Sequence, residues 1–287
     1  MIEYPQHKKL SDEYIIGKIA YFLAEDIPNG DITTESTTAD NSEITAEIHA
    51  AEKLIFAGSE IIPHCFGEKC QVTINHKNGS MLSNGDVIGA VTGSTREILS
   101  RERVMLNLIQ RLCGIATLSH EYAEIANPFD VKILDTRKTT PGLRLFEKYA
   151  VAIGGAFNHR LNLSHGILIK DNHIIAAGSV TNAIESARKK DLHLPLELEV
   201  DNFDQIHEAL KTGVDGFLLD NMKPETIRSA VSIIRASQNG EDVFIEASGG
   251  ITLENIPSYL DTGINAISIG ALTHQARSKN IRLDFIS

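Results

Sequence analysis

The chain has 287 residues, of which 42% are hydrophobic and 23% charged, and its formal net charge at pH 7 is −11. This composition is typical of a folded globular protein, and the length suits one large α/β domain or one with a smaller companion. The negative charge argues against broad binding to nucleic acid or to membrane surfaces, since both require an excess of Lys and Arg. Any site for an anion must therefore be local.

The cysteines and the apolar runs bear on where the protein resides. Cys65, Cys70 and Cys113 form no CxxC pair, so we expect free thiols in a reducing cytoplasm. No apolar run approaches the ~20 residues that cross a bilayer. The first residues also lack the basic and apolar segments of a secretory signal. We therefore expect a cytoplasmic protein without a membrane partner.

The first part of the chain predicts a small α/β domain. Residues 11–24 begin with a serine suited to capping a helix and carry apolar residues at helical spacing. From Ile44 to Gly93, alternating runs such as ITAEIHA and QVTINH are separated by Asn-Gly turns, which predicts strands. Residues 95–126 return to helical period, and we expect Gly114 to be the joint between two helices that lead to a second domain.

From residue 130 onward the chain repeats a strand and a helical segment. The predicted strands are VKILD, GILIK, LELEV, GFLLD, VFIEAS and AISIG. Gly213 and Gly263 precede two of them in similar contexts, and we expect both to end helices. Such repetition predicts a parallel sheet. An open doubly wound sheet is the alternative, but no Gly-rich loop follows the first strand, which favours a complete or incomplete barrel of the TIM kind.

Polar residues stand where the predicted strands end, and these ends would meet on the face where barrel enzymes have their active sites. They are Asp135, Thr136, Arg137, Lys138, Lys170, Glu199, Asp220, Ser248, Gly249, Gly250 and Gly270. His159 and Arg160 add a cationic pair between two of these strands. Clustered cations with a few carboxylates suit a phosphorylated substrate held together with a divalent metal.

Several of these residues have a structural alternative. Glu199 and Asp220 could hold Mg²⁺, or they could cap the following helices or pair with Lys170. The glycines at 249–250, between a strand and an expected helix, could bind phosphate through backbone N–H groups or form a simple turn. Asp135 we interpret as structural. Arg101 and Arg103 stand on the polar side of the 95–126 helix, where a solvated face is the simplest interpretation.

These residues also carry a resemblance to a known family. The runs DTRKTTPGLR, EKYAV, LIKDNH, LDNM, EASGGI and GALTH, with His159-Arg160 and GDITT near the N-terminus, closely match nicotinate-nucleotide pyrophosphorylases (carboxylating), also called quinolinate phosphoribosyltransferases. The match covers almost the whole chain. Asn162, His165 and Pro28-Asn29 depart from the usual family residues, which affects only the expected geometry of loops.

The resemblance implies a fold and a reaction. The fold is the α/β type II phosphoribosyltransferase fold: an N-terminal α/β sandwich over 1–113, an incomplete TIM-like barrel over 114–273, and a segment 274–287 that packs back on the first domain. The reaction joins quinolinate and phosphoribosyl pyrophosphate to give nicotinate mononucleotide, pyrophosphate and CO₂ in NAD biosynthesis, with Mg²⁺. The implied partners are these two substrates and a second copy of the chain, with possible higher assembly.

The resemblance also implies roles for individual residues. Arg137, Lys138, His159 and Arg160 are similar to residues that bind the quinolinate carboxylates, with Arg103 reaching in from a neighbouring subunit. Thr136 belongs to the same substrate-binding segment, and Lys138 and Lys170 lie near the phosphoribosyl group. Glu199 and Asp220 stand on the metal and ribose side. The implied phosphate side comprises Ser248, Gly249, Gly250, Gly270 and His274. Lys138, Lys170, Glu199 and Asp220 are the expected catalytic residues.

Three other functions fit parts of this pattern. The first is a molybdenum-transport-associated protein of the same fold, which the runs around Arg137 and Lys170 match less well. A Schiff-base aldolase is the second, because Lys138 and Lys170 both follow barrel strands and a desolvated lysine can attack a carbonyl. A sensor that binds the phosphoribosyl donor without releasing pyrophosphate is the third.

Overall fold

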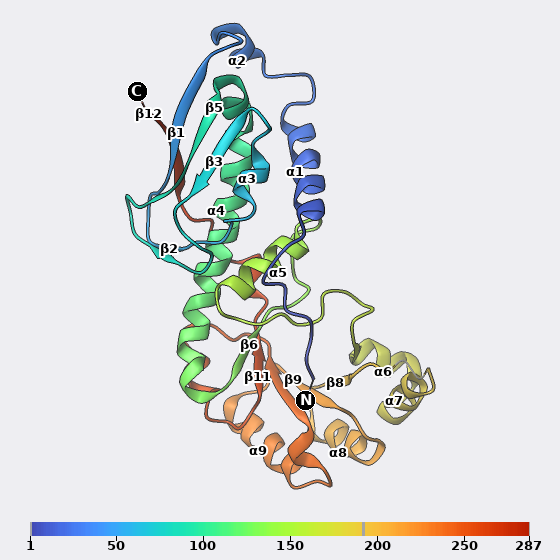
Figure 1. Cartoon of the computed structure of the whole chain (residues 1–287). Coiled ribbons are helices and arrows are strands. Elements are labelled where there is room, and N and C mark those ends of the chain that lie inside the picture. Colours follow the sequence, from blue (N-terminus) through green and yellow to red (C-terminus); the bar gives the residue numbers. More distant parts are fainter. Residues whose placement is uncertain (1, 191–192, 287) are drawn as a thin grey trace. The chain divides into compact units, whose positions relative to one another are not determined.

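The structure is a computed structural model that describes residues 2–190 and 193–286 (Figure 1). It divides into two compact units. The barrel unit comprises Met1–Gln6, Glu121–Arg144 and Ala156–His274, and the sandwich unit comprises His7–His120, Leu145–Gly155 and Gln275–Ser287. The domain limits expected from the sequence stay a prediction. Within the described ranges, no helix is both long and apolar enough to cross a membrane.

The sandwich unit is built on a four-stranded antiparallel sheet. Its strands are ordered β12 (Ile281–Ile286), β1 (Glu43–Ala50), β5 (Val87–Ser94) and β3 (Cys70–Ile74). A small second sheet pairs β2 (Leu54–Ile55) with β4 (Met81–Leu82). The helices of this region are α1 (Asp12–Asp26), α2 (Ile32–Thr37), α3 (Ile62–Cys65), α4 (Thr95–Ala126) and α5 (Arg144–Ile153). The predicted helix and strands of this half are confirmed, and Ser11 caps α1 by accepting a hydrogen bond from the Tyr14 amide at 3.3 Å.

The joint expected at Gly114 is wrong, because α4 runs unbroken through 32 residues. The glycine serves a different purpose. A Cβ atom at position 114 would lie 2.2 Å from the carbonyl oxygen of Arg277, so the backbone after the barrel unit passes directly against this turn of the helix. Gly114 therefore permits a close approach of two backbones rather than a break.

Two helical glycines provide a matched test of this interpretation. Gly114→Ala gains helix propensity but forces backbone apart, so we expect it to lower the free energy of unfolding by ~1–3 kcal/mol. Gly17→Ala in α1, where a Cβ would meet nothing within 4 Å, should raise it by ~0.5–1 kcal/mol. Urea unfolding of both variants checks the pair. Equal stabilisation by the two substitutions would show that nothing crowds Gly114.

The barrel unit contains a six-stranded parallel sheet that confirms the expected fold class (Figure 1). Its order is β6 (Lys132–Leu134), β11 (Ala266–Ser268), β10 (Phe244–Ser248), β9 (Gly216–Asp220), β8 (Leu196–Val200) and β7 (Ile167–Ile169). Because β6 and β7 stand at the two ends of this order, the barrel is incomplete. Phe157 extends it slightly through a parallel bridge to Leu134.

Helices of varied length precede, connect and follow these strands. They are α6 (Asp171–Ala177), α7 (Val180–Arg188), α8 (Phe203–Thr212), α9 (Pro224–Arg235) and α10 (Ala271–His274), with 3-10 turns η1 (Asn127–Phe129), η2 (Gly240–Asp242) and η3 (Ile256–Ser258). Gly213 ends α8 with a φ of 93°, as expected. Gly263 ends no α-helix, because only η3 stands between β10 and β11. There the Asn255 side chain bonds the Thr252 amide and the Gly250 carbonyl, and Pro257 lacks an N–H, so local bonds replace a helix.

Alternation along the strands decides which side chains enter the barrel. In β9 the residues Phe217 and Leu219 are fully buried on the outer, helix-covered side, whereas Leu218 and Asp220 line the interior cavity. The same alternation in β10 sends Glu246 and Ser248 inward. The interior of the barrel at the C-terminal ends of the strands is therefore polar.

Candidate active site

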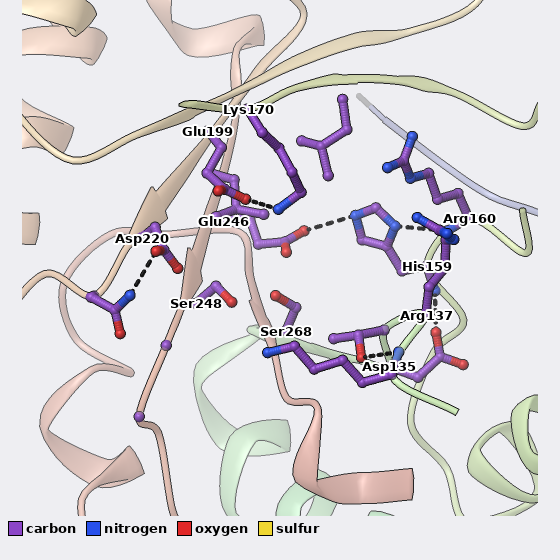
Figure 2. A pocket seen from close by; sticks show the side chains of 17 residues that line it. Asp135, Arg137, His159, Arg160, Lys170, Glu199, Asp220, Glu246, Ser248 and Ser268 are labelled. Atoms are coloured by element: carbon purple, nitrogen blue, oxygen red, sulfur yellow. Dashed lines mark hydrogen bonds and ion pairs between the residues drawn. The ribbon is translucent and has the colours of Figure 1, made fainter. Parts of the chain in front are cut away.

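A cavity of about 540 Å³ opens among the C-terminal ends of the parallel strands, within the barrel unit (Figure 2). The predicted site residues that line it are Thr136, Arg137, Lys138, His159, Arg160, Lys170, Glu199, Asp220, Ser248, Gly249 and Gly250. Its further lining residues are Asp135, Leu168, Leu218, Asn221, Glu246 and Ser268. Arg103 is not among them; it is exposed on α4, in the sandwich unit.

The register of the sheet explains why side chains from distant segments meet here. Ser248 pairs with Asp220 on one neighbouring strand and with Ser268 on the other. These three polar side chains therefore stand in one row across β9, β10 and β11. Because parallel strands end at the same edge, the row forms one wall of the cavity.

The segment that follows β6 carries two of the cations. The Thr136 hydroxyl accepts a hydrogen bond from the Lys138 amide at 3.0 Å, and the Lys138 carbonyl accepts one from the Thr273 hydroxyl at 2.7 Å. A Cβ at Gly270 would lie 2.8 Å from Cδ of Lys138 and 3.1 Å from Nε2 of His274. Gly270 thus lies close to both Lys138 and His274, although neither Gly270 nor His274 lines the cavity itself.

Arg137 presents a donor that the protein leaves unsatisfied. Its Nε–H is buried and donates no hydrogen bond to any described residue. A buried donor without a partner costs ~1–3 kcal/mol. An anionic ligand in the cavity would recover this cost, since a guanidinium matches a carboxylate through two parallel hydrogen bonds.

Asp135 holds the other cationic segment in place. Its carboxylate accepts hydrogen bonds from the Asn158 side chain and from the His159 amide, both at 2.8 Å. Arg160, the next residue, is buried and donates a hydrogen bond to the Gly166 carbonyl at 2.9 Å. Burial and the nearby Arg137 lower the pKa of Arg160. Asp135 is therefore structural, as interpreted, through the backbone that carries His159 and Arg160.

The two predicted metal ligands lie at the ends of adjacent strands. Glu199 on β8 forms an ion pair with Lys170, and Asp220 on β9 accepts a hydrogen bond from the Asn221 side chain at 2.6 Å. Neither caps a helix, because the N-caps of α8 and α9 are Asn202 and Lys223. Two carboxylates facing one cavity supply the hard oxygen donors that Mg²⁺ prefers.

The Gly249-Gly250 turn fits closely against the residue after β9. Gly249 and Gly250 have φ values of 92° and 63°, and a Cβ at position 249 would lie 2.2 Å from Oδ1 of Asn221. The backbone of Asn221 is in the left-handed region, and its amide N–H donates a hydrogen bond to the Ser248 carbonyl at 2.8 Å. The backbone at these positions can therefore approach a ligand closely, but no α-helix begins directly after it.

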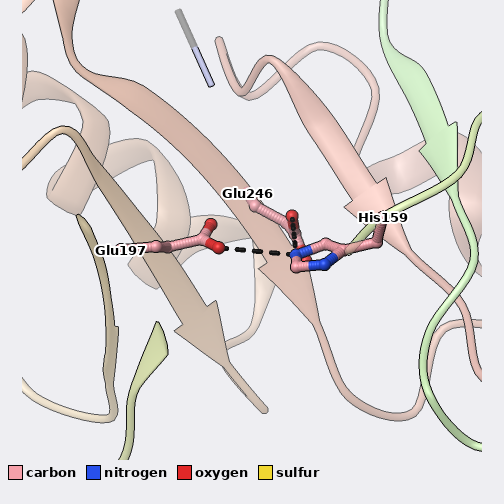
Figure 3. Close-up of side chains that lie close together, drawn as sticks. All are labelled: His159, Glu197 and Glu246. Atoms are coloured by element: carbon pink, nitrogen blue, oxygen red, sulfur yellow. Dashed lines mark ion pairs between the residues drawn. The ribbon is translucent and has the colours of Figure 1, made fainter. Parts of the chain in front are cut away.

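The sequence-based prediction did not single out Glu197 and Glu246, which lie fully buried beside His159 (Figure 3). Their oxygens approach Nε2 of His159 to 3.4 Å and 3.5 Å. The runs LELEV and VFIEAS contained the signal: when helices cover one face of a strand, polar residues at alternate positions must face the barrel interior.

Burial changes the protonation of this pair. It raises the pKa of Glu197 to about 7, and burial followed by the charge of Glu197 raises the pKa of Glu246 to about 8. His159 accepts the Arg160 amide at Nδ1 at 2.7 Å, so the proton of a neutral imidazole stands on Nε2, toward both carboxylates. The three side chains could also hold a divalent transition metal, but the charges of Arg160 and Lys170 nearby oppose this.

These shifts predict how stability depends on pH. The folded protein keeps a proton on Glu246 up to about pH 8, whereas the unfolded chain loses it near pH ~4.3. The contribution of this group to the free energy of unfolding therefore declines as pH rises between these values. Glu246→Gln mimics the protonated form, so its stability relative to wild type should improve steadily from about pH 5 to 8.

Urea unfolding at several pH values measures this difference. Glu185→Gln, a change of an exposed glutamate on α7, is the matched control and should show a constant offset. A constant offset for Glu246→Gln as well would mean that Glu246 is ionised in the folded protein throughout this range.

Comparison with known proteins adds independent evidence. Residues 31–113 match the family described as quinolinate phosphoribosyl transferase, N-terminal domain, and residues 115–284 match its C-terminal domain. The chain is 45% identical over 268 residues to a probable nicotinate-nucleotide pyrophosphorylase [carboxylating] of Bacillus subtilis, covering 92% of this chain and 91% of the relative. It is 37% identical to the Mycobacterium leprae protein of that name, covering 91% and 94%.

A solved structure gives the same result. The nicotinate-nucleotide pyrophosphorylase from Francisella tularensis superimposes with a TM-score of 0.92 at 34% identity, covering 99% of this chain and all of that one.

Proposed function

The chain belongs to the quinolinate phosphoribosyl transferase family, and we propose that its barrel cavity transfers phosphoribosyl from phosphoribosyl pyrophosphate to quinolinate with loss of CO₂. The products are nicotinate mononucleotide, pyrophosphate and CO₂, and the step belongs to NAD biosynthesis. The observation that carries this assignment is the unsatisfied, buried Nε–H of Arg137 in a cavity that also holds Lys138, Arg160 and Lys170.

Charge explains why both substrates fit this cavity. Quinolinate is a dianion and the phosphoribosyl donor carries several more negative charges, so the site needs local cations on a protein whose net charge is −11. Arg137 and Arg160 suit the planar carboxylates, whereas the lysines act as compact charges toward phosphate. We assign the phosphate end to Ser248, Gly249, Gly250, Gly270 and His274, and Thr136 to the substrate-binding segment.

The bond changes follow from this placement. The ring nitrogen of quinolinate forms a bond to C1′ of the ribose as the bond from C1′ to the pyrophosphate oxygen breaks. Positive charge develops on the ribose, where Glu199 and Asp220 stabilise it, and negative charge develops on the leaving group, where Lys138 and Lys170 act. The alkylated ring is an electron sink, so the bond from C2 to its carboxylate breaks and C2 takes up a proton. No covalent enzyme intermediate is needed.

We also propose that Glu199 and Asp220 hold Mg²⁺ at this site. The carboxylates fit the ion because they offer hard oxygen ligands from neighbouring strand ends in a phosphate-binding cavity. Bound Mg²⁺ would neutralise charge on the phosphate oxygens. Lys170 also offsets the negative charge of Glu199 through their ion pair.

The direct test is to incubate the protein with Mg²⁺, quinolinate and phosphoribosyl pyrophosphate and to measure nicotinate mononucleotide and CO₂. Product in the expected ratio of one to one supports the proposal. Binding of the donor without release of pyrophosphate would instead indicate a sensor. Trapping of a carbonyl substrate on Lys138 or Lys170 by borohydride would indicate a Schiff-base enzyme.

We predict that nicotinate is a very poor acceptor. It lacks the 2-carboxylate, so the buried Nε–H of Arg137 would remain without an anionic acceptor. We expect kcat/KM for nicotinate to be lower than for quinolinate by on the order of a thousandfold or more. Competition kinetics with both acids measures the ratio, and comparable turnover would contradict the assigned carboxylate site.

We further propose a homodimer in which Arg103 completes the neighbouring subunit's cavity. Arg103 is exposed and does not line the cavity of its own barrel unit. A two-fold interface would exchange the same residue in both directions.

A cytoplasmic location fits the three cysteines, all of which are free thiols.

Subunit mixing tests the shared site. Arg103→Ala and Lys138→Ala should each be nearly inactive, but refolding them together should restore about a quarter of wild-type sites, because half of the dimers contain one intact cavity. Activity assays on the mixture, with native mass spectrometry to show that mixed dimers form, provide the measurement. If mixed dimers form and activity stays at the level of the separate variants, Arg103 does not act across subunits.

A further inference from the structure

The N-terminal residues 2–6 lie on the barrel unit, and we call them the strap. Ile2 is buried and packs with Leu134, Phe244 and Ala266 inside the barrel. Glu3 forms an ion pair with Lys132 on β6 at 3.6 Å. The strap therefore follows the β6 side of the barrel, where the order of the parallel sheet ends.

Gln6 binds the backbone of Asn158 as a neighbouring strand would. Its side-chain oxygen accepts the Asn158 amide at 2.8 Å, and its side-chain nitrogen donates to the Asn158 carbonyl at 3.1 Å. Asp135 fixes the same stretch through the Asn158 side chain and the His159 amide. The backbone that carries His159 and Arg160 is thus held by β6 and by the strap together.

Tyr4 supports the imidazole itself. Its ring stacks on His159 with centroids 4.6 Å apart and an angle of 28° between the planes. A Cβ at Gly166 would lie 2.9 Å from this ring, so the small residue makes room for it. The Tyr4 hydroxyl is buried and makes no hydrogen bond with described residues. Its position is therefore set by the ring and not by a polar contact.

Together these contacts leave His159 little freedom. Nδ1 accepts the Arg160 amide, Nε2 faces Glu197 and Glu246, and Tyr4 covers a face of the ring. Loss of Tyr4 would open that face, and loss of Gln6 would release one side of the 158–160 backbone. Both changes would displace groups assigned to quinolinate without touching Glu199, Asp220 or Ser248.

We propose that the strap positions the acceptor site: Tyr4 and Gln6 hold His159 and Arg160 in the geometry that binds the quinolinate carboxylates. This inference rests on the proposed function for the identity of the acid. Tyr4 and Gln6 act through the binding residues and are positioning residues. The donor end of the cavity is built from other strands and does not depend on them.

Four variants test the proposal: Tyr4→Ala, Gln6→Ala, the conservative Tyr4→Phe, and Glu3→Gln as a control within the strap that leaves His159 untouched. Calorimetric titration with quinolinate alone measures the affinity of the acceptor end of the cavity. Titration with phosphoribosyl pyrophosphate alone measures the affinity of the donor end. We expect Tyr4→Ala and Gln6→Ala to weaken quinolinate binding by about tenfold and donor binding by less than about twofold. Tyr4→Phe and Glu3→Gln should bind both substrates as wild type does.

Steady-state kinetics should agree, with KM for quinolinate raised and KM for the donor unchanged. Gln6 is exposed, so we expect its variant to fold even if Tyr4→Ala does not, and Gln6→Ala then decides the outcome. Wild-type quinolinate affinity in Tyr4→Ala or Gln6→Ala overturns the proposal, as does an equal loss for both substrates. If wild-type protein forms no product yet the variants lose quinolinate affinity selectively, the strap stands and the proposed function fails.

Discussion

The cavity depends first on the carboxylate of Asp135. This group is fully buried at the end of β6, and two of its hydrogen bonds reach the segment that carries His159 and Arg160. A buried carboxylate without such donors would be very costly, so the two elements must form together. Arg137 stands two residues after Asp135, so the buried hydrogen bonds of Asp135 also fix the distance between Arg137 and the His159-Arg160 pair. The binding residues are therefore ordered before the substrate arrives, which reduces the loss of conformational entropy on binding.

A second constraint is the balance of charge inside the barrel. Glu197 and Glu246 are buried near the cations Arg160 and Lys170. Burial raises the pKa of both carboxyl groups. Were both ionised, they would cancel part of the positive potential that attracts a dianion. The proton that Glu246 keeps up to about pH 8 preserves part of that potential. Glu199 forms a direct ion pair with Lys170.

Much of the barrel and of its site was accessible from the sequence because the signals are local. Each strand ends in polar residues, and the rule that parallel strands end at one edge brings Arg137, Lys170 and Asp220 to one cavity. The predicted joint at Gly114 was wrong because a helical glycine is equally typical of a break and of a close backbone approach. The backbone that approaches it, at Arg277, is remote in sequence. η3 replaced an expected helix because Asn255 and Pro257 supply a local alternative.

The buried glutamates and the strap required the fold itself. Glu197 and Glu246 become a pair only once β8 and β10 flank β9, and their alternation could be interpreted only with helices on the outer face. The strap has no periodic pattern in its five residues, and its partners lie across the chain: Gln6 and Asn158 are 152 positions apart. Contacts of this kind leave no trace in composition or spacing. They arise only in the fold, where Phe157 pairs with β6 and the strap bonds to the residue that follows Phe157.

The order of the sandwich sheet has a consequence for synthesis. β1 lies between β5 and β12, yet β12 is translated only after the whole barrel unit. Until then β1 exposes a row of unpaired N–H and C=O groups, in a strand whose inward residues are apolar. A nascent chain stalled within the barrel therefore offers an open β-edge to other chains, and such edges are templates for aggregation. Rapid completion of translation, or a chaperone that covers β1 meanwhile, would protect the chain during this interval.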